Sequence, residues 1–535
     1  MSTAAPNSGQ MPRQIPYIIA NEACERFSFY GMRNILVTFL VGSTLMAYLP
    51  EAERQLAAKD VFHEFVIGVY FFPLLGGWLA DRWFGKYNTI FWFSLIYCAG
   101  QAMLAAFTEN RTLFYLGLFL IAFGSGGIKP LVASFMGDQF DQSNKRLAKI
   151  AFDAFYWLIN FGSLFASLFM PILLRGYGPA VAFGVPGALM FVATFVFWLA
   201  RHRYVHVPPA TRDPDSFLRV VMTALKAPGN GSGGTFVALL GVALAALAIV
   251  GWLLNTLGAA SFWTLAFVPS FCLAIVFVMA GGGIGASMQL DRARGTHPDA
   301  AVDGVRSVLR ILIVFALTTP FWSLFDQKAS TWVLQGYDMA MPQGIWWWPS
   351  FLVKDAAQMQ ALNPLLVMLL IPFNNLVLYP ALRRFGYEPT ALRRMTTGIA
   401  FTGVAWIAAG VLQLWIDGGD SVSLAWQILP YALLTFGEVL VSATGLEFAY
   451  SQAPASMKGV IMSFWYLAVT IGNLWVLLVN AGVRNEAFTA QIATTGLSVA
   501  GFQMFFFAAF ALVAALIFGL YARRYPLQEN YRPAG

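Results

Sequence analysis

Apolar runs close to 20 residues long recur along the whole of this 535-residue chain. A helix needs roughly 20 mostly apolar residues to cross the hydrocarbon core of a bilayer. Charged residues make up only 11% of the chain, whereas soluble domains carry about 25%. The runs are continuous and do not alternate with a period of two, which argues against a membrane β-barrel. The sequence therefore predicts an all-α polytopic membrane protein.

The spacing of these runs divides the chain into three parts. We expect an N-terminal six-helix bundle (1–200), a cytoplasmic linker (201–309) and a C-terminal six-helix bundle (310–535). The linker holds two extra transmembrane helices, at about 235–256 and 261–283. The other predicted spans are 20–48, 62–80, 88–107, 113–134, 150–172, 180–200, 310–334, 361–380, 395–415, 425–449, 459–481 and 501–521. The total is about fourteen.

Arginine and lysine gather in alternate loops between the spans. They are frequent at 82–86, 145–149 and 383–394, whereas only Arg111 lies near 108–112 and none lies in 414–424. Basic loops remain on the cytoplasmic side of a membrane. We therefore expect both termini in the cytoplasm, and we attribute the net charge of +7 to topology and not to nucleic-acid binding.

The first apolar segment carries four ionisable residues, Glu22, Glu25, Arg26 and Arg33. Their spacing places them on one face of one helix. Each charge near the bilayer centre costs roughly 2.5–3.5 kcal/mol on insertion scales. Such a face must border a polar interior, and ion or substrate movement is the usual reason for it.

Other predicted spans also carry ionisable side chains. Lys129 lies in a glycine-rich part of the fourth span, and His63 lies at the start of the second. Asp326 follows Arg310 by sixteen residues in the seventh main span, and Glu438 lies in the tenth. A lysine can extend to an interface, a histidine at a helix start is often interfacial, and a carboxylate can be half of a structural ion pair. Their number in one membrane domain favours a proton or ion pathway.

A basic turn after the second span has the form Gly-x-x-x-Asp-Arg-x-x-Gly, with Gly77, Asp81, Arg82 and Gly85. A second basic turn closed by glycine, Tyr379–Gly386, stands at the equivalent place in the second half. Either could be an ordinary cytoplasmic turn. The first form is a signature of major facilitator transporters, in which it would serve a gate. Two six-helix halves related by a repeat also fit that fold.

Six motifs in order resemble the proton-dependent oligopeptide transporter family of the major facilitator superfamily, over nearly the whole chain. The family adds two helices between its halves in bacterial members, which matches the predicted linker. One departure is Phe29, where the family often has a tyrosine. The motifs occupy Glu22–Gly31, Gly124–Pro130, Phe155–Leu164, Phe321–Gln327, Gln360–Pro364 and Gly437–Phe448.

The resemblance implies a proton-coupled symporter that takes up di- and tripeptides by alternating access. The protein would lie in the cell (inner) membrane and function as a monomer. It would have no cofactor apart from the proton as coupling ion, and no enzymatic activity. Its partners would be small peptides and the lipid bilayer, without nucleic acid.

The resemblance also implies roles for particular residues. Arg33 and Lys129 would bind the peptide carboxylate, and Glu438 would bind the amino terminus. Asn160 and Asn363 would contact the backbone amides. The aromatic lining would consist of Tyr30, Tyr70, Tyr156, Trp322 and Trp465. Proton coupling would use Glu22, Glu25, Arg26, Lys129, His63, Asp326 and Arg310, with Asp326 paired to Arg310 or to Arg33.

Other classes of function find less support in the sequence. The four histidines are scattered, and no metalloprotease, nucleophile-elbow or nucleotide-binding motif is present. Within transporters, the alternative is a family relative that carries another small substrate, such as nitrate or an amino acid.

Overall fold

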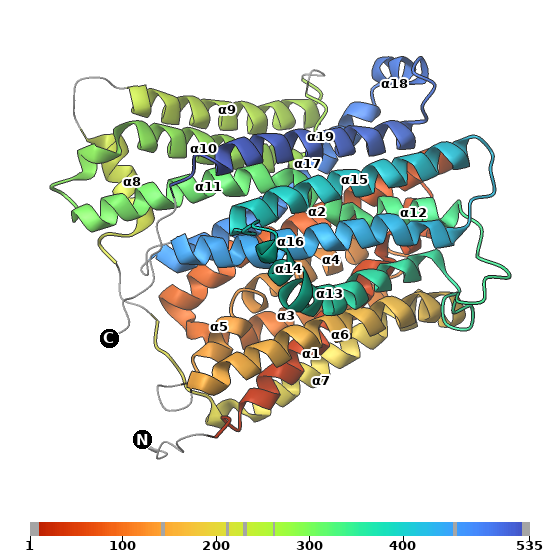
Figure 1. Cartoon of the computed structure of the whole chain (residues 1–535), viewed down its shortest axis with the longest axis horizontal. Helices are drawn as coiled ribbons and strands as arrows, with labels where there is room; N and C mark the ends of the chain where they lie inside the picture. Colours follow the sequence, from red (N-terminus) through yellow and green to blue (C-terminus); the bar gives the residue numbers. More distant parts are fainter. Residues whose placement is uncertain are drawn as a thin grey trace. The chain divides into compact units, whose positions relative to one another are not determined.

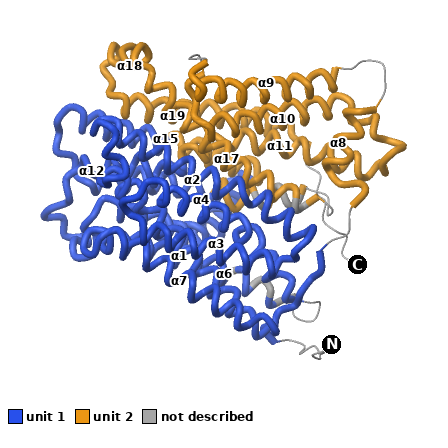
Figure 2. The backbone as a smooth tube through the Cα atoms, turned by 180° about the vertical axis from the view of Figure 1, so that it is seen from behind, with its two compact units in different colours: residues 1–211, 325–389, 404–439 blue, residues 212–324, 390–403, 440–535 orange. Residues whose placement is uncertain are grey.

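The computed structural model describes residues 10–140, 145–209, 213–227, 233–259, 263–452 and 457–526. This part of the chain is helical and contains no strand, only isolated bridges between Arg294 and His297 and between Ala340 and Ser423 (Figure 1). The chain forms two compact units (Figure 2). Unit 1 comprises residues 1–211, 325–389 and 404–439, and unit 2 comprises 212–324, 390–403 and 440–535.

Most helices belong to one unit, and three run across the division. Unit 1 holds α1 (Ile15–Gly42), α2 (Glu51–Leu79), η2 (Ala80–Phe84), α3 (Gly85–Ala106), α4 (Arg111–Ile128), α5 (Val132–Gly137), α6 (Lys145–Tyr177), α7 (Pro179–Leu199), η5 (Gln327–Ala329), α12 (Thr331–Tyr337), η6 (Ala356–Ala361), α13 (Leu362–Phe373), η7 (Asn374–Leu378) and α14 (Tyr379–Arg384). Unit 2 holds α8 (Phe217–Lys226), α9 (Gly233–Thr256), α10 (Phe267–Gln289), η4 (Leu290–Ala293), α17 (Lys458–Val483), α18 (Glu486–Ala493) and α19 (Val499–Ala522). The shared helices are α11 (Asp299–Asp326), α15 (Ala391–Asp417) and α16 (Ile428–Gln452).

The number of membrane helices agrees with the prediction. The described residues hold twelve stretches that are long and apolar enough to cross a membrane. One of them, Glu51–Ala106, contains both α2 and α3, and α1 is not among the twelve because it carries four ionisable residues. Counting α2 and α3 separately and adding α1 gives the predicted fourteen, so the fold class is confirmed.

Two predicted spans end earlier than their apolar runs. The first was expected to reach residue 48, but α1 ends at Gly42 and a short 3-10 turn, Thr44–Met46, follows. The seventh main span was expected to reach residue 334, but α11 ends at Asp326. The last part of the run is a 3-10 turn (η5) followed by a separate helix, α12.

Glycines allow three helices of unit 1 to approach closely. A Cβ atom added to Gly76 of α2 would lie 2.2 Å from the carbonyl oxygen of Gly126 in α4. A Cβ added to Gly124 would lie 2.7 Å from the backbone nitrogen of Tyr97 in α3. Small residues at such crossings let backbones pack directly against one another, which is a major source of cohesion between membrane helices.

The two basic turns identified in the sequence share an unusual backbone. The first contains η2, a π-helical segment, and closes on Gly85 with φ of +72°. The second follows directly on η7, also π-helical, includes α14 and closes on Gly386 with φ of +77°. Glycine adopts this left-handed conformation without the penalty that a side chain imposes. The local likeness agrees with an internal repeat.

The two compact units do not follow the predicted bundle boundaries, because segments of the second predicted half lie in unit 1. The three-part organisation rests on an internal-repeat argument, which contact density does not test, and it stays a prediction. Within the predicted linker, the structure adds a helix that the sequence analysis did not identify, the amphipathic α8.

The contact at Gly76 generates a prediction about stability. Gly76→Ala should lower the free energy of unfolding by about 1–3 kcal/mol, because the new methyl group meets a rigid backbone. Thermal unfolding of the purified protein in one detergent measures the loss. Gly77→Ala is the matched control, because a Cβ at Gly77 meets nothing within 4 Å. Equal melting temperatures for the two variants would contradict the packing argument.

Candidate functional site

Three charged side chains on α1 form a buried ionic group. The Nε atom of Arg26 lies 2.6 Å from Oε1 of Glu22 and 3.1 Å from Oε2 of Glu25. Glu22 and Glu25 are 3% and 0% exposed. Glu22 accepts a hydrogen bond from Arg26, whereas neither oxygen of Glu25 accepts one in the described part of the chain. One guanidinium therefore holds two carboxylates, and Glu25 is the less tightly bound of them.

Lys129 follows the end of α4 and is also buried. Its Nζ lies 3.6 Å from the centre of the Phe29 ring and 4.6 Å from that of Tyr70. It makes no hydrogen bond to any described residue, and it interacts electrostatically with Glu25. An aromatic face attracts a cation by roughly 2 kcal/mol when desolvated, which compensates its burial only in part. The structure thus brings Lys129 together with the α1 network.

Arg33 forms an ion pair with Asp326 at the end of α11. Its Nη2 donates to Oδ1 of Asp326 over 2.6 Å, and the two side chains are 4% and 2% exposed. The sequence left Arg310 as another partner. Sixteen residues of helix place Arg310 about 24 Å from Asp326 along α11, so the pair with Arg33 is the one formed.

His63 of α2 is fully buried. Its Nε2 lies 3.0 Å from Oγ of Ser330, which follows η5. Asp326, four residues before Ser330, is the partner of Arg33. Arg33 and His63 therefore contact the two sides of the short break between α11 and α12. Arg33 binds Asp326, the last residue of α11, and His63 binds Ser330, just before α12.

Lys328 lies within the same break and leads to Glu438. Its Nζ donates to Oδ1 of Asn363 over 2.8 Å, and Nδ2 of Asn363 donates to Oε2 of Glu438. Asn363 also donates to Thr435, and Tyr431 donates to the carbonyl of Lys328. Asn363 and Glu438, which were both predicted to contact the peptide, are therefore neighbours. The ammonium group of Lys328 extends the same series of hydrogen bonds.

The predicted tyrosine and asparagine contacts of unit 1 have different surroundings. Asn160 donates to the carbonyl of Tyr156 in its own helix, α6, and the Tyr156 side chain is 46% exposed. Tyr30 packs edge-on against Phe29 and interacts electrostatically with Arg33 and Glu438. Tyr70 is one of the two rings at Lys129.

The two predicted tryptophans belong to unit 2. The rings of Trp322 and Trp465 are 5.7 Å apart and nearly perpendicular. A Cβ added to Gly472 would lie 2.5 Å from Cβ of Trp322, so glycine is needed beside this pair. Arg310 also lies in unit 2, where its carbonyl accepts from Tyr521. The roles predicted for these three residues stay predictions.

The predicted gate motif lies around η2. Asp81 and Arg82 are within the π-helical segment, and Gly85 needs its positive φ. The ion pair at this turn is made by Lys86, whose Nζ lies 2.7 Å from Oδ2 of Asp138. Asp81 interacts electrostatically with both. The turn is thus held to the segment after α5.

Several polar contacts between distant segments could not be predicted from the sequence. Asp138 lies in the run Gly-Asp-Gln-Phe at 137–140, but the sequence does not indicate that Lys86 is its partner. Gln360 donates to the carbonyl of Asn34, and Arg175 forms an ion pair with Asp355 over 2.8 Å. No group of three or more His, Cys, Asp or Glu side chains in the described residues could hold a metal ion.

Membrane-spanning helices around a set of buried acids and bases define the class of secondary transporters. Residues 87–495 match the POT family, which is more than half of the chain. The chain belongs to the POT family, and the resemblance drawn from the six motifs is confirmed.

Curated relatives agree with this assignment. The chain is 32% identical over 501 residues to "Peptide transporter 3" of Caenorhabditis elegans, covering 90% of this chain and 61% of that protein. It is 31% identical over 422 residues to "Solute carrier family 15 member 2" of Homo sapiens, covering 76% of this chain and 49% of that protein. The chain thus spans about half to three fifths of the length of these relatives.

Two solved structures are similar along almost their full length. One is described as "Crystal structure of auto inhibited POT family peptide transporter"; it has 66% identity and a TM-score of 0.91, with 98% of this chain and 99% of that chain covered. The other is described as "In meso crystal structure of the POT family transporter PepTSo"; it has 64% identity and a TM-score of 0.90, with 96% and 98% covered.

The buried pair of Arg33 and Asp326 generates a prediction about stability. Asp326→Asn should destabilise the protein by about 3–5 kcal/mol, because it leaves a guanidinium buried without its counter-charge. Thermal unfolding in detergent measures this loss. Arg33→Gln combined with Asp326→Asn should lose less than the sum of the single changes, since both charges are then absent. Asp420→Asn, at an exposed position, is the control. Additive losses would show that the two side chains have no interaction energy, which contradicts the argument.

Proposed function

We propose that this protein is a proton-coupled symporter that takes up di- and tripeptides by alternating access. The observation that carries the proposal is the acid–base network of α1 and Lys129. It combines the Glu25 carboxylate with the Lys129 ammonium group, neither of which has a hydrogen bond to any residue that the structure describes. Buried groups of this kind respond strongly to a change in each other's charge. The names of the curated relatives, several of which are peptide transporters, support the substrate class.

The proposed peptide site uses opposite charges for the two ends of a zwitterion. Arg33 and Lys129 bind the carboxylate, since a guanidinium suits a bidentate contact with a carboxylate. Glu438 binds the amino terminus, and Asn160 and Asn363 contact the backbone amides. Aromatic walls tolerate varied side chains, and five rings supply them. These rings are Tyr30, Tyr70, Tyr156, Trp322 and Trp465.

The proposed coupling step is protonation of Glu25. A neutral Glu25 no longer attracts Lys129, so the ammonium group becomes available to the peptide carboxylate. Glu22 and Arg26 set the charge balance around this step. His63, Asp326 and Arg310 are the further groups proposed to take part. The proton is the only coupling ion, and no cofactor is proposed.

The proposed setting is the cell (inner) membrane, with both termini in the cytoplasm and a functional monomer. In this proposal the protein has no enzymatic activity and does not bind nucleic acid. The second candidate is a carrier of another small substrate, such as nitrate or an amino acid. Glu438 favours a peptide over an anion, because a carboxylate at the site would repel an anion.

Uptake by the purified protein in liposomes tests the function. An inward proton gradient should drive accumulation of labelled dialanine, and unlabelled di- and tripeptides should compete for it. Free alanine and nitrate, at the same concentrations, should compete weakly. Competition by nitrate or alanine equal to that by dipeptide would favour the second candidate. Absence of gradient-dependent uptake in liposomes that still exchange peptide would refute proton coupling.

Glu25→Gln tests the coupling step separately. The variant should lose at least nine tenths of gradient-driven accumulation, because residue 25 can no longer exchange a proton, while it retains exchange of peptide across the membrane. Initial rates of both reactions in liposomes provide the comparison. Glu51→Gln, at an exposed position in the first turn of α2, is the matched control. Gradient-driven accumulation by Glu25→Gln equal to that of the unsubstituted protein would refute the coupling proposal.

A further inference from the structure

The short helix α8 lies outside the predicted spans and has two distinct faces. Its buried face consists of Val220, Val221 and Ala224. On the opposite face, Leu218 and Met222 are 69% and 44% exposed. Figure 1 shows α8 lying across the ends of α9 and α10 rather than along them, and α8 contacts both helices and η4. With ten residues, α8 is also too short to cross a bilayer core, which needs roughly 20.

Hydrogen bonds from a histidine fix both ends of α8. His297 precedes α11, and its Nδ1 lies 2.7 Å from Oδ1 of Asp215, just before α8. Its Nε2 lies 2.9 Å from Oγ1 of Thr223, in the second half of α8. One side chain thus ties α8 to the chain that leads into α11.

Further contacts satisfy the end of α8 and hold its first residue. The amide nitrogen of Gln289, at the end of α10, donates to the carbonyls of Ala224 and Leu225. Such carbonyls have no partner within a helix and need one from elsewhere. Phe217 packs edge-on against Phe464 of α17, with ring centres 5.7 Å apart. The orientation of α8 within unit 2 is therefore fixed, and so is the direction of its exposed face.

The exposed face combines apolar and basic side chains. Successive residues of a helix are about 100° apart, so Leu218, Met222, Lys226 and Arg219 fall in one sector of about a third of the circumference. The two apolar residues form one edge of the sector, and the two basic residues form the other. Arg219 and Lys226 are exposed and have no ion-pair partner among the described residues.

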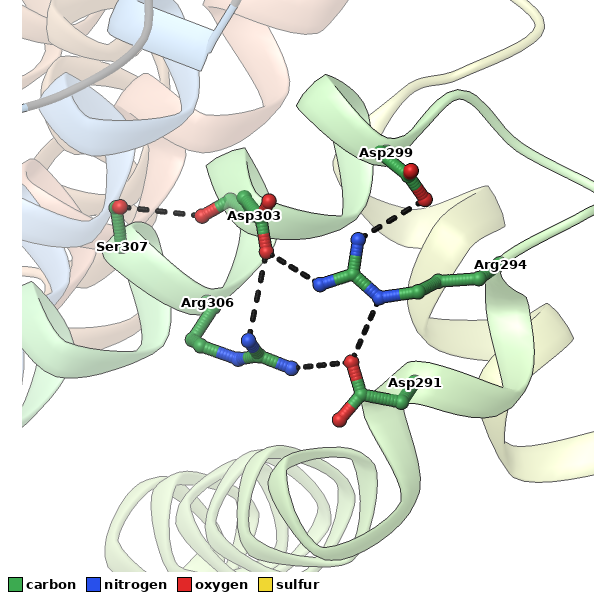
Figure 3. Close-up of polar contacts among 6 residues, drawn as sticks. All are labelled: Asp291, Arg294, Asp299, Asp303, Arg306 and Ser307. Carbon is green, nitrogen blue, oxygen red and sulfur yellow. Dashed lines mark hydrogen bonds and ion pairs between the residues drawn. The ribbon is translucent and has the colours of Figure 1, made fainter.

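Two other basic residues, Arg294 and Arg306, lie in a network with three aspartates and carry no excess positive charge. Arg294 pairs with three aspartates and Arg306 with two of them, as Figure 3 shows. This network joins η4 to the start of α11. The residues of the network are Asp291, Arg294, Asp299, Asp303 and Arg306. Arg219 and Lys226 are thus the basic side chains of α8 that no ion pair among the described residues neutralises.

We propose that α8 is an interfacial helix that binds anionic lipid headgroups of the cytoplasmic leaflet. Amphipathic helices with apolar and basic sides lie in the membrane surface, with the apolar side reaching about 5–10 Å into the headgroup and acyl boundary. Leu218 and Met222 enter this boundary, and Arg219 and Lys226 bind the lipid phosphates. The proposal assigns a partner to a helix outside the peptide site, and it holds whatever substrate is carried.

Lipid titration of the full chain tests the charge contribution. Dioleoyl-phosphatidylglycerol added to the protein in maltoside micelles should raise its melting temperature, whereas dioleoyl-phosphatidylcholine should raise it less. In Arg219→Gln/Lys226→Gln, half-maximal stabilisation should need roughly fivefold more phosphatidylglycerol for each charge removed. Arg523→Gln/Arg524→Gln removes the same charge from the end of α19 and should change the titration less. An equal shift in both double variants, or equal stabilisation by inorganic phosphate, would overturn the proposal.

Spin labelling tests the position of the apolar edge. A nitroxide on Met222→Cys, in bilayers containing phosphatidylglycerol, should be more accessible to oxygen than to a water-soluble nickel complex. The label on Asp213→Cys, in the exposed chain before α8, should show the reverse. The three native cysteines are buried or half-buried, and the unsubstituted chain gives their background. Preferential access of nickel to residue 222 would show that the face points to water, which contradicts the proposal.

Discussion

The buried ion pair between Arg33 and Asp326 is the contact on which the interior of unit 1 depends. It joins α1 to the end of α11, 293 residues further along the chain, with both side chains almost fully buried. Neither charge could remain in an apolar interior alone, so each requires the other. The same break after α11 supplies Ser330 to His63 and Lys328 to Asn363. One irregular segment thus provides partners for polar groups from several helices.

The charge of Lys129 is less completely paired than that of Arg33. Arg33 has a counter-ion at hydrogen-bond distance, whereas Lys129 has aromatic rings and a carboxylate that acts at longer range. A fully paired charge is stable in one arrangement. An incompletely paired charge is held weakly, and a proton on Glu25 or an anionic ligand changes its balance. Both sites use residues of α1, and the one around Lys129 is the more responsive to a change in charge.

The sequence predicted most of the fold because its main signals are local. The length of the apolar runs predicted the fourteen membrane helices, and helical spacing predicted that Glu22 and Arg26 share one face of a helix. Contacts between distant segments could not be predicted in this way. That Arg33 is the partner of Asp326 depends on α1 meeting the end of α11, and the link from Lys328 to Glu438 depends on Asn363 lying between them. The helix α8 was missed because ten amphipathic residues in a polar stretch give a weak signal.

Phe29 shows how the structure changes the meaning of a departure from the family pattern. The family often has a tyrosine here, and Phe29 lacks its hydroxyl group. In the structure the ring is 1% exposed and its face lies 3.6 Å from Nζ of Lys129. The attraction of a cation to an aromatic face needs the ring and not a hydroxyl group. Phenylalanine therefore preserves the property that the buried ammonium group requires at this position, and Tyr30, next in the chain, retains a hydroxyl beside it.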